Sequence, residues 1–148
     1  MGVTQLPAKK AKGYQKAVAV LEREVAVMKQ SSGPRYEAYL TQFLGQSIQR
    51  NLAFVFMEYL PFGDMAQYVE GNARFLSEDE AMTITRQVLS CLQLMHDSGY
   101  VHRDIKPTNI FIKRCPPTGE WWVKIGDFGI ACHYPDRCLR GPMSLVGT

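Results

Sequence analysis

The sequence predicts an α+β domain. Two segments with helical periodicity and three short apolar segments of strand character follow one another along 148 residues. At this length, and with 46% hydrophobic residues, the chain is large enough for one ordinary globular domain and too short for two of average size. We therefore interpret it as one domain, or as part of one.

The first helix is predicted over residues 14–30, "YQKAVAVLEREVAVMKQ". Leu21, Val25 and Met28 follow the i, i+4, i+7 spacing of one apolar face, and the "SGP" that comes next ends the helix. Glu24 falls at the edge of that apolar stripe. Two interpretations stay open for it: a carboxylate that pairs with a cation or donor across the packed face, or one that reaches water at the rim.

A buried strand is predicted over residues 51–59, "NLAFVFMEY", because the run is short, continuous and rich in aromatic residues. It leads into "LPFGD", whose proline and glycine end regular structure and predict an exposed connector.

A second helix is predicted to begin at Ser77, which forms a capping box with Glu80, and to end at Gly99. One face of this helix is apolar and comprises Ile84, Val88, Cys91 or Leu92, and Met95. Two apolar pieces then follow, "NIFI" and "WWVKI", on either side of the turn-rich "KRCPPTGE". This pattern indicates a hairpin with a long connection.

Composition argues against several classes of protein. A net charge of +3 does not predict nucleic acid as a partner, and the lysines near the N-terminus are interpreted as solvated. The start lacks the apolar core of a secretory signal, and the longest apolar run, "LAFVFM", is too short to cross a bilayer. Four cysteines without a C-x-x-C pair fit a reducing compartment, so an intracellular, cytoplasmic protein is expected. Cys132, His133 and Cys138 have poor spacing for a zinc site.

The stretch "HRDIKPTN", residues 102–109, concentrates chemistry between two apolar runs. Asp104, Asn109 and the later Asp127 supply oxygen ligands suited to a hard cation such as magnesium. Lys106 adds a positive charge between them. A carboxylate that holds no metal can accept a proton, while lysine and magnesium together stabilise charge on a transferring group, for which phosphate is the natural candidate.

These residues carry a resemblance to the eukaryotic protein kinases: "HRDIKPTN" resembles their catalytic loop, and "DFG" at 127–129 resembles their metal-binding motif. The resemblance implies that Asp104 accepts or orients the proton of the substrate hydroxyl. It further implies that Asn109 and Asp127 hold Mg²⁺, and that Lys106 neutralises the moving phosphoryl group. A lysine at position 106 is typical of the serine/threonine kinases, which implies ATP as the phosphate donor and a protein as the substrate.

The stretch "FVFMEYLPFGD" resembles the fifth strand and hinge of a kinase small lobe. The resemblance makes Met57 the gatekeeper, with backbone groups of Glu58 and Leu60 bonding adenine and Phe111 forming the floor of the pocket. A plain hydrophobic core is the alternative for Met57 and Phe111.

The domain is thereby divided into a small-lobe part at 1–57, a hinge at 58–64 and a large-lobe part at 65–148. The resemblance predicts that Glu24 pairs with a lysine of the preceding strand, but that position falls near Thr4, in "GVTQL". The closing "SLVGT" resembles the end of an activation segment, with Thr148 positioning the catalytic residues. The expected fold is a bilobal kinase-like one, incomplete at both ends, without the Gly-rich loop and the later large-lobe helices.

Ser144 lies where an activating phosphate could sit, with Arg103 as its partner; an unmodified serine and a structural arginine are the alternative. For the whole chain, an ATP- and Mg²⁺-dependent serine/threonine kinase is expected. The alternatives are a catalytically inactive pseudokinase or scaffold, and a truncated kinase fragment. The oligomeric state is not predicted.

Overall fold

The computed structural model describes residues 2–5, 13–71, 75–128 and 131–133. The elements, in chain order, are β1 (Gly2–Gln5), α1 (Tyr14–Gln30), β2 (Phe43–Gln49), β3 (Leu52–Met57), α2 (Met65–Gly71), α3 (Glu78–Asp97), β4 (Tyr100–Val101), the 3-10 helix η1 (Pro107–Asn109), β5 (Ile110–Arg114), β6 (Trp122–Ile125) and β7 (Cys132–His133).

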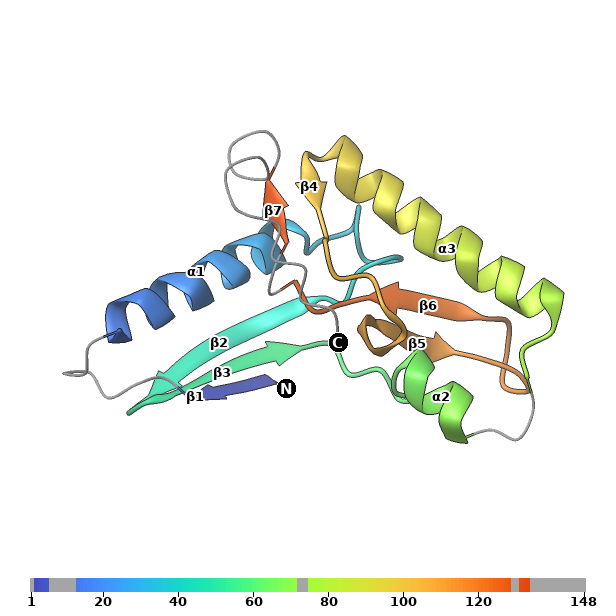
Figure 1. Cartoon of the computed structure of the whole chain (residues 1–148), viewed down its shortest axis with the longest axis horizontal. Coiled ribbons are helices and arrows are strands. Elements are labelled where there is room, and N and C mark those ends of the chain that lie inside the picture. The colour runs from blue at the N-terminus through green and yellow to red at the C-terminus, as the bar shows by residue number, and fades with distance from the viewer. Residues whose placement is uncertain (1, 6–12, 72–74, 129–130, 134–148) are drawn as a thin grey trace.

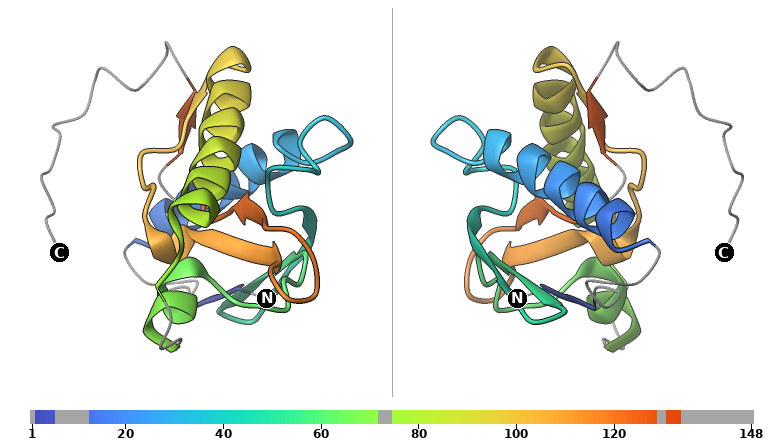
Figure 2. Two further views of the ribbon diagram at one scale, coloured as in Figure 1. Left: turned by 90° about the vertical axis from the view of Figure 1, so that its right-hand side faces the viewer. Right: turned by 90° about the vertical axis from the view of Figure 1, so that its left-hand side faces the viewer.

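Figure 1 shows two groups of elements side by side. In one, α1 lies over a three-stranded antiparallel sheet of order β1-β3-β2. In the other, the antiparallel β5–β6 hairpin lies between α3 and α2, as both Figure 1 and Figure 2 show. A two-stranded pair, β4–β7, lies near the end of α3. This α+β arrangement confirms the predicted fold class.

Both predicted helices are confirmed, and their ends have local causes. Helix α3 begins after Ser77, whose side chain accepts from the Glu80 N–H while the Glu80 carboxylate accepts from the Ser77 N–H. Two of the four unpaired N–H groups at the helix start are thereby satisfied. Helix α1 ends at Gln30, where the N–H of the C-cap residue Ser31 donates to the Val27 carbonyl at 2.9 Å. Gly33 follows with a φ of 124°, which glycine adopts and other residues rarely do.

The main core joins the two groups of elements. It contains buried side chains from α1, from the sheet, from α3, from the end of β6 and from the segment that follows: Leu21, Val25, Met28, Val55, Cys91, Met95, Ile125 and Phe128. A parallel bridge between Leu40 and Ile125 ties the segment before β2 to the end of β6. The apolar faces predicted for the two helices therefore pack into one core.

The connector after β3 differs from the expectation of an exposed loop. Tyr59 and Phe62 are exposed, but Leu60 is buried. β3 ends at Met57, before the predicted end at residue 59 and before Pro61 and Gly63. The chain then forms the short helix α2, whose Met65 is buried beside β5. Tyr68 of α2 contacts the Trp121 ring edge-on at a centroid distance of 5.1 Å, which anchors the helix to the hairpin.

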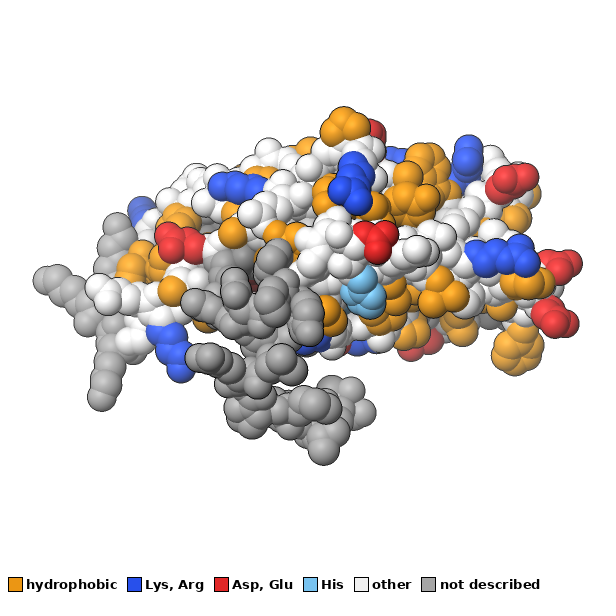
Figure 3. All heavy atoms as spheres, turned by 90° about the horizontal axis from the view of Figure 1, so that it is seen from above, with side chains coloured by type: hydrophobic (Ala, Val, Ile, Leu, Met, Phe, Trp, Pro, Cys, Tyr) orange, Lys and Arg blue, Asp and Glu red, His pale blue; other side chains and the backbone are white. Residues whose placement is uncertain are grey.

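The visible surface mixes charges of both signs. On the face seen from above, Lys and Arg side chains are interspersed with Asp and Glu and with apolar groups (Figure 3). Among the helices of the described ranges, none combines the length and the apolar character that a membrane crossing needs.

Candidate active site

The catalytic-loop candidate begins immediately after β4 and ends in η1. Its first residue, His102, is almost fully buried, and its ring lies 5.6 Å from the Phe128 ring. The Asp104 N–H donates to His102 Nδ1 at 3.3 Å, so the proton is on Nε2, which donates to the carbonyl oxygen of Gly126 at 3.1 Å. The imidazole therefore links the loop to the residue that precedes Asp127.

Burial lowers the pKa of His102, although its bond to the Gly126 carbonyl and the nearby carboxylates of Asp104 and Asp127 act in the opposite direction. Burial has the larger effect, because removing an imidazolium from water disfavours the charged form. The ring is therefore held neutral, in the tautomer that the two hydrogen bonds need.

Asp104, Lys106 and Asn109 form one connected group. The Lys106 ammonium lies 3.0 Å from Asp104 Oδ2, and Asn109 Nδ2 donates to the same oxygen at 3.0 Å and to the Asp104 carbonyl at 2.9 Å. These contacts lower the pKa of Asp104, with Lys106 as the largest cause, against a smaller opposing effect of burial. Asp104 is therefore ionised at neutral pH and held in a fixed orientation.

Asp127 follows β6 and has a φ of 61°, which is unusual for a residue other than glycine. The chain brings it to the catalytic loop through its neighbour, since the Gly126 N–H donates to the Asn109 carbonyl at 3.0 Å. Its side chain is exposed, whereas the following Phe128 is buried in the core. The carboxylate of Asp127 therefore faces solvent, while the ring of Phe128 faces the core.

The oxygen donors at this site fit a magnesium ion. The Asn109 amide nitrogen donates to Asp104, so its amide oxygen is on the other branch of the side chain and can coordinate a cation. Asp127 adds an exposed carboxylate. Hard oxygen ligands of this type, with room for water, are what Mg²⁺ requires.

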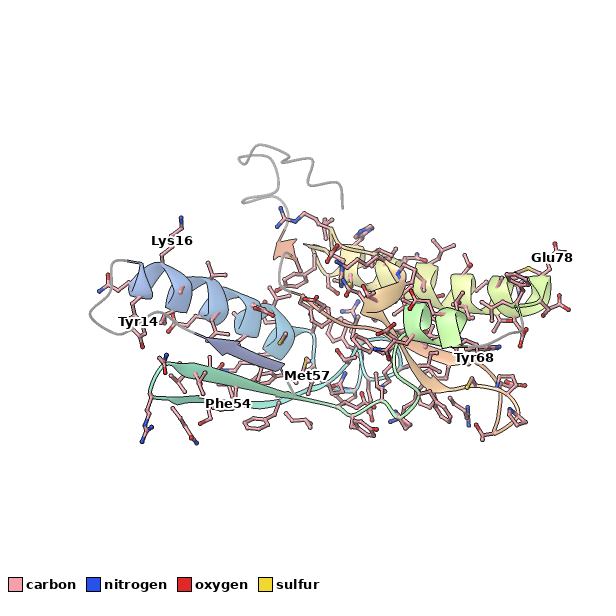
Figure 4. The ribbon with its side chains drawn as sticks, turned by 60° about the horizontal axis from the view of Figure 1, so that its bottom comes forward. Tyr14, Lys16, Phe54, Met57, Tyr68 and Glu78 are labelled. Atoms are coloured by element: carbon pink, nitrogen blue, oxygen red, sulfur yellow. The ribbon has the colours of Figure 1, made fainter. Side chains whose placement is uncertain are left out.

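A cavity of about 250 Å³ lies between β3, the connector, α2 and β5. It is lined by Thr41, Met57, Glu58, Tyr59, Leu60, Gly63, Asp64, Gln67 and Phe111. This lining includes all four residues for which the sequence predicts contact with adenine, namely Met57, Glu58, Leu60 and Phe111. Figure 4 shows Met57 at the end of β3, where the sheet meets the rest of the molecule. The Glu58 N–H donates to the Gln42 carbonyl at 2.8 Å, so a ligand contact of this backbone would use its carbonyl oxygen.

The Glu58 side chain pairs with two lysines of the hairpin. Lys113 Nζ lies 2.7 Å from Oε1, and Lys124 Nζ lies 2.7 Å from Oε2. Burial raises the pKa of Glu58, but these hydrogen bonds and charges outweigh it, so the pKa is lowered overall. Lys124 is almost fully buried, and a buried ammonium is stable only when it is paired.

Glu24 lies half-buried on α1, as its position at the edge of the apolar stripe predicts. Its pKa is raised, first by burial and second by the Asp127 carboxylate. The lysine-bearing strand expected from the resemblance corresponds to β1, in which Thr4 pairs with Ala53 of β3. Glu24 is therefore near a like charge, and the predicted position of its cationic partner carries a threonine.

Some of the residues singled out from the sequence lie outside the described ranges. Ser144, Thr148 and Cys138 are outside them. Arg103 is exposed, with a φ of 67°. Within the described ranges, no group of three potential metal ligands from His, Cys, Asp and Glu is present.

Sequence reasoning missed Thr41, Lys113 and Lys124. A lysine inside the apolar run "WWVKI" is a usable signal, because a charge in a buried strand needs a partner. Thr41 gives no such signal in the sequence, since only the fold places it in the lining of the cavity. A second cavity, of about 350 Å³, lies at the start of α3 against Trp121, away from the residues discussed above.

Comparison with known proteins identifies the family. The family model for the protein kinase domain matches residues 3–148. Similar curated proteins include mitogen-activated protein kinase kinase kinase 5 of Arabidopsis thaliana, which is 28% identical over 128 residues. They also include the probable serine/threonine-protein kinase PknB of Lactococcus lactis, 32% identical over 132 residues, and the human serine/threonine-protein kinase ULK1, 32% identical over 137 residues. The matches cover 86%, 89% and 89% of this chain, but only 16%, 20% and 12% of these relatives.

Proposed function

Because this chain belongs to the protein kinase family, we propose that it transfers the γ-phosphate of ATP to serine or threonine hydroxyls of proteins. One observation carries the proposal: Asn109 connects the two acids, by its side chain to Asp104 and by its backbone carbonyl to the residue before Asp127. A proton acceptor and a set of metal ligands thereby share one small region.

The proposed reaction gives Asp104 and Lys106 distinct roles. The substrate hydroxyl oxygen attacks the γ-phosphorus, the bond to the bridging oxygen of ADP breaks, and ADP leaves with the electron pair. Asp104, kept ionised by Lys106, orients the hydroxyl and takes its proton. Lys106 also stabilises charge on the transferring group.

Asn109 and Asp127 would hold Mg²⁺, which neutralises the phosphate oxygens when it is bound. Protein residues position the remainder of the nucleotide. The proposed site for the base is the cavity that Met57, Glu58, Leu60 and Phe111 line. A mostly apolar cavity with a few polar groups is typical of a site for a flat heterocycle.

Phosphate transfer to peptides tests the proposal. We expect the 148-residue chain to label peptides that contain serine or threonine in the presence of Mg²⁺ and ATP, and not peptides in which tyrosine is the sole hydroxyl. Asp104→Asn is expected to reduce the rate by roughly a hundredfold or more, since it removes the proton acceptor. Asp97→Asn, at an exposed position at the end of α3, is the matched control.

Equal rates for Asp104→Asn and the unmodified chain would contradict the assignment of Asp104. Absence of transfer from every form would leave the second candidate function, an ATP-binding protein without transfer. The observation that favours this candidate is Glu24, half-buried near Asp127, with a threonine at the position where a lysine is expected.

Two measurements separate the candidates. A thermal shift with Mg²⁺ and ATP reports binding, because a ligand that binds the folded state alone raises the apparent stability. Thr4→Lys supplies the expected cation, so it is expected to raise the transfer rate if the missing charge limits catalysis, whereas Thr4→Met, a neutral side chain of similar length, is not. Binding without transfer, together with a gain in Thr4→Lys alone, would identify the chain as a binding protein.

A further inference from the structure

The connector between β3 and α2, residues 58–64, is attached to the β5–β6 hairpin at both of its ends. At the end next to α2, the attachment is made by the backbone. The Ile112 N–H donates to the Gly63 carbonyl at 2.8 Å, and Asp64 forms an antiparallel bridge with Phe111. Backbone contacts of this kind do not depend on which side chains the connector carries.

At the end next to β3, the attachment is made by the Glu58 side chain. Its two carboxylate oxygens lie 2.7 Å from Lys113 Nζ on β5 and 2.7 Å from Lys124 Nζ on β6, and we call these three residues the ion triad. The Lys124 side chain is 2% exposed and the Glu58 side chain 16%, so salt screens their attraction much less than at the surface. The first residue of the connector is therefore held by charge.

The ion triad reaches the cavity through Glu58. Glu58 lines the cavity together with Leu60 and Phe111, whereas neither lysine belongs to the lining in the described part of the chain. In the register of the hairpin, Lys124 pairs with Phe111. The backbone of Lys124 is therefore fixed beside Phe111, while its ammonium holds Glu58. This one side chain sets the spacing between two parts of the cavity lining.

The catalytic-loop residues are held by other contacts. Asp104 is bound by Lys106 and Asn109, and the Gly126 N–H donates to the Asn109 carbonyl beside Asp127. None of these contacts includes a member of the ion triad. Loss of the triad is therefore expected to release the connector and to leave the phosphate-transfer groups in place.

We propose that Lys113 and Lys124 are positioning residues for the nucleotide, which act through Glu58 and touch no ligand themselves. They hold the connector at the spacing from Phe111 that a flat base needs. This inference rests on the proposed function, which assigns the cavity to the base. A connector that is already fixed loses little conformational freedom when the base binds, so the triad lowers the cost of binding.

The triad is tested first by Lys124→Met, which removes the buried charge and keeps a long side chain. We expect the KM for ATP to rise about five- to tenfold, because the connector must then be ordered on binding. The kcat at saturating ATP is expected to change by less than about twofold, since the groups that act on the phosphate stay in place. Lys113→Met is expected to have a smaller effect, because Lys113 is 35% exposed and Glu58 keeps its buried partner.

A second variant separates positioning from stability. In Glu58→Gln with Lys124→Met no uncompensated charge is buried, so stability lost in Glu58→Gln is partly regained. The connector remains without its attachment, so the KM for ATP is expected to stay raised. All rates are measured well below the melting temperature of the weakest variant. Lys16→Met, exposed on α1 (Figure 4), is the control and is expected to keep the KM of the unmodified chain.

Calorimetric titration gives the same comparison without turnover. Adenosine, which has no phosphates, is expected to bind Lys124→Met more weakly by the same factor as ATP. Binding of magnesium tripolyphosphate, which has no base, is expected to be unchanged. An equal loss for tripolyphosphate would overturn the inference, because the effect would not arise at the base.

The outcomes separate this inference from the proposed function. An unchanged KM in Lys124→Met, a fall in kcat alone, or a double variant that regains stability and KM together would each overturn the positioning role and leave the proposed function in place. If the unmodified chain binds neither ATP nor adenosine, the proposed function fails, and the inference fails with it.

Discussion

The role of an individual residue in this chain depends on partners that are distant in the sequence. Glu58 is the clearest case, since its two lysine partners lie 55 and 66 positions away. Its carboxylate neutralises Lys124 inside the molecule, while its backbone forms part of the proposed base site. A single side chain thereby couples the connector to both strands of the hairpin.

We predict that Glu58→Gln lowers the free energy of unfolding by about 3 kcal/mol, because it leaves the buried Lys124 ammonium without a counter-charge. This value is at the low end for a broken buried pair, since the Trp122 ring, 5.6 Å from Nζ, still offers a cation–π contact. Urea denaturation measures the change. Glu70→Gln, exposed on α2, is the control and is expected to have no measurable effect.

Adding Lys124→Met to Glu58→Gln is expected to restore part of the lost stability, because the uncompensated charge is then absent. A double variant as unstable as the sum of the two single variants would contradict this account of the pair.

At the scale of elements, α3 and the hairpin depend on one another through Glu80. Its carboxylate closes the capping box with Ser77, and Oε1 also accepts from Trp121 Nε1 at 3.1 Å. The Gln87 side chain adds bonds to the Trp121 carbonyl and the Val123 N–H, at 2.7 Å and 2.9 Å. The start of the helix is therefore fixed to the strand that leads to Asp127.

We predict that Ser77→Ala destabilises the protein by about 1 kcal/mol, as expected for loss of an N-cap side chain. Ser90→Ala, at an exposed position inside the same helix, is the matched control and is expected to be neutral or slightly stabilising. Thermal unfolding followed by circular dichroism measures both. Equal effects of the two substitutions would show that the cap contributes nothing specific.

At the scale of the whole molecule, one core connects the two groups of elements, and His102 lies at its edge next to Phe128. Its pKa is lowered in the folded protein, mainly by burial. As the pH falls below the ordinary pKa of 6.5, His102 therefore binds a proton more readily in the unfolded chain than in the folded chain. This contribution to stability is present above that pH and is lost as the pH falls.

We predict a lower melting temperature at pH 5.5 than at pH 7.5, and a smaller difference in His102→Gln, which cannot titrate. Glu58, whose pKa is also lowered, loses its contribution at more acidic pH, below its ordinary value of 4.5. Glu24 acts in the opposite direction, because its raised pKa favours the folded state as the pH falls. A pH dependence that is identical in His102→Gln and the unmodified chain would contradict the assignment to this histidine.

Much of this architecture follows from short-range patterns. The extents of α1 and α3 could be predicted because apolar periodicity and end signals act within a few residues, and so could the β5–β6 hairpin. The loop at residues 102–109 was predictable for the same reason, since its functional residues lie side by side in the sequence. The short elements β2, α2, β4 and β7 were not predicted, because each depends on packing against partners elsewhere in the chain.

The amino-acid order alone specifies the two long helices, since local hydrogen bonds and side-chain periodicity act between near neighbours, and its motifs carry the resemblance to the protein kinases. The tertiary fold was needed to bring Lys124 to Glu58, to place Thr41 in the lining of the cavity, and to put Glu24 near Asp127. Burial and charge pairing are properties of the neighbours in space, and only the folded chain defines those neighbours.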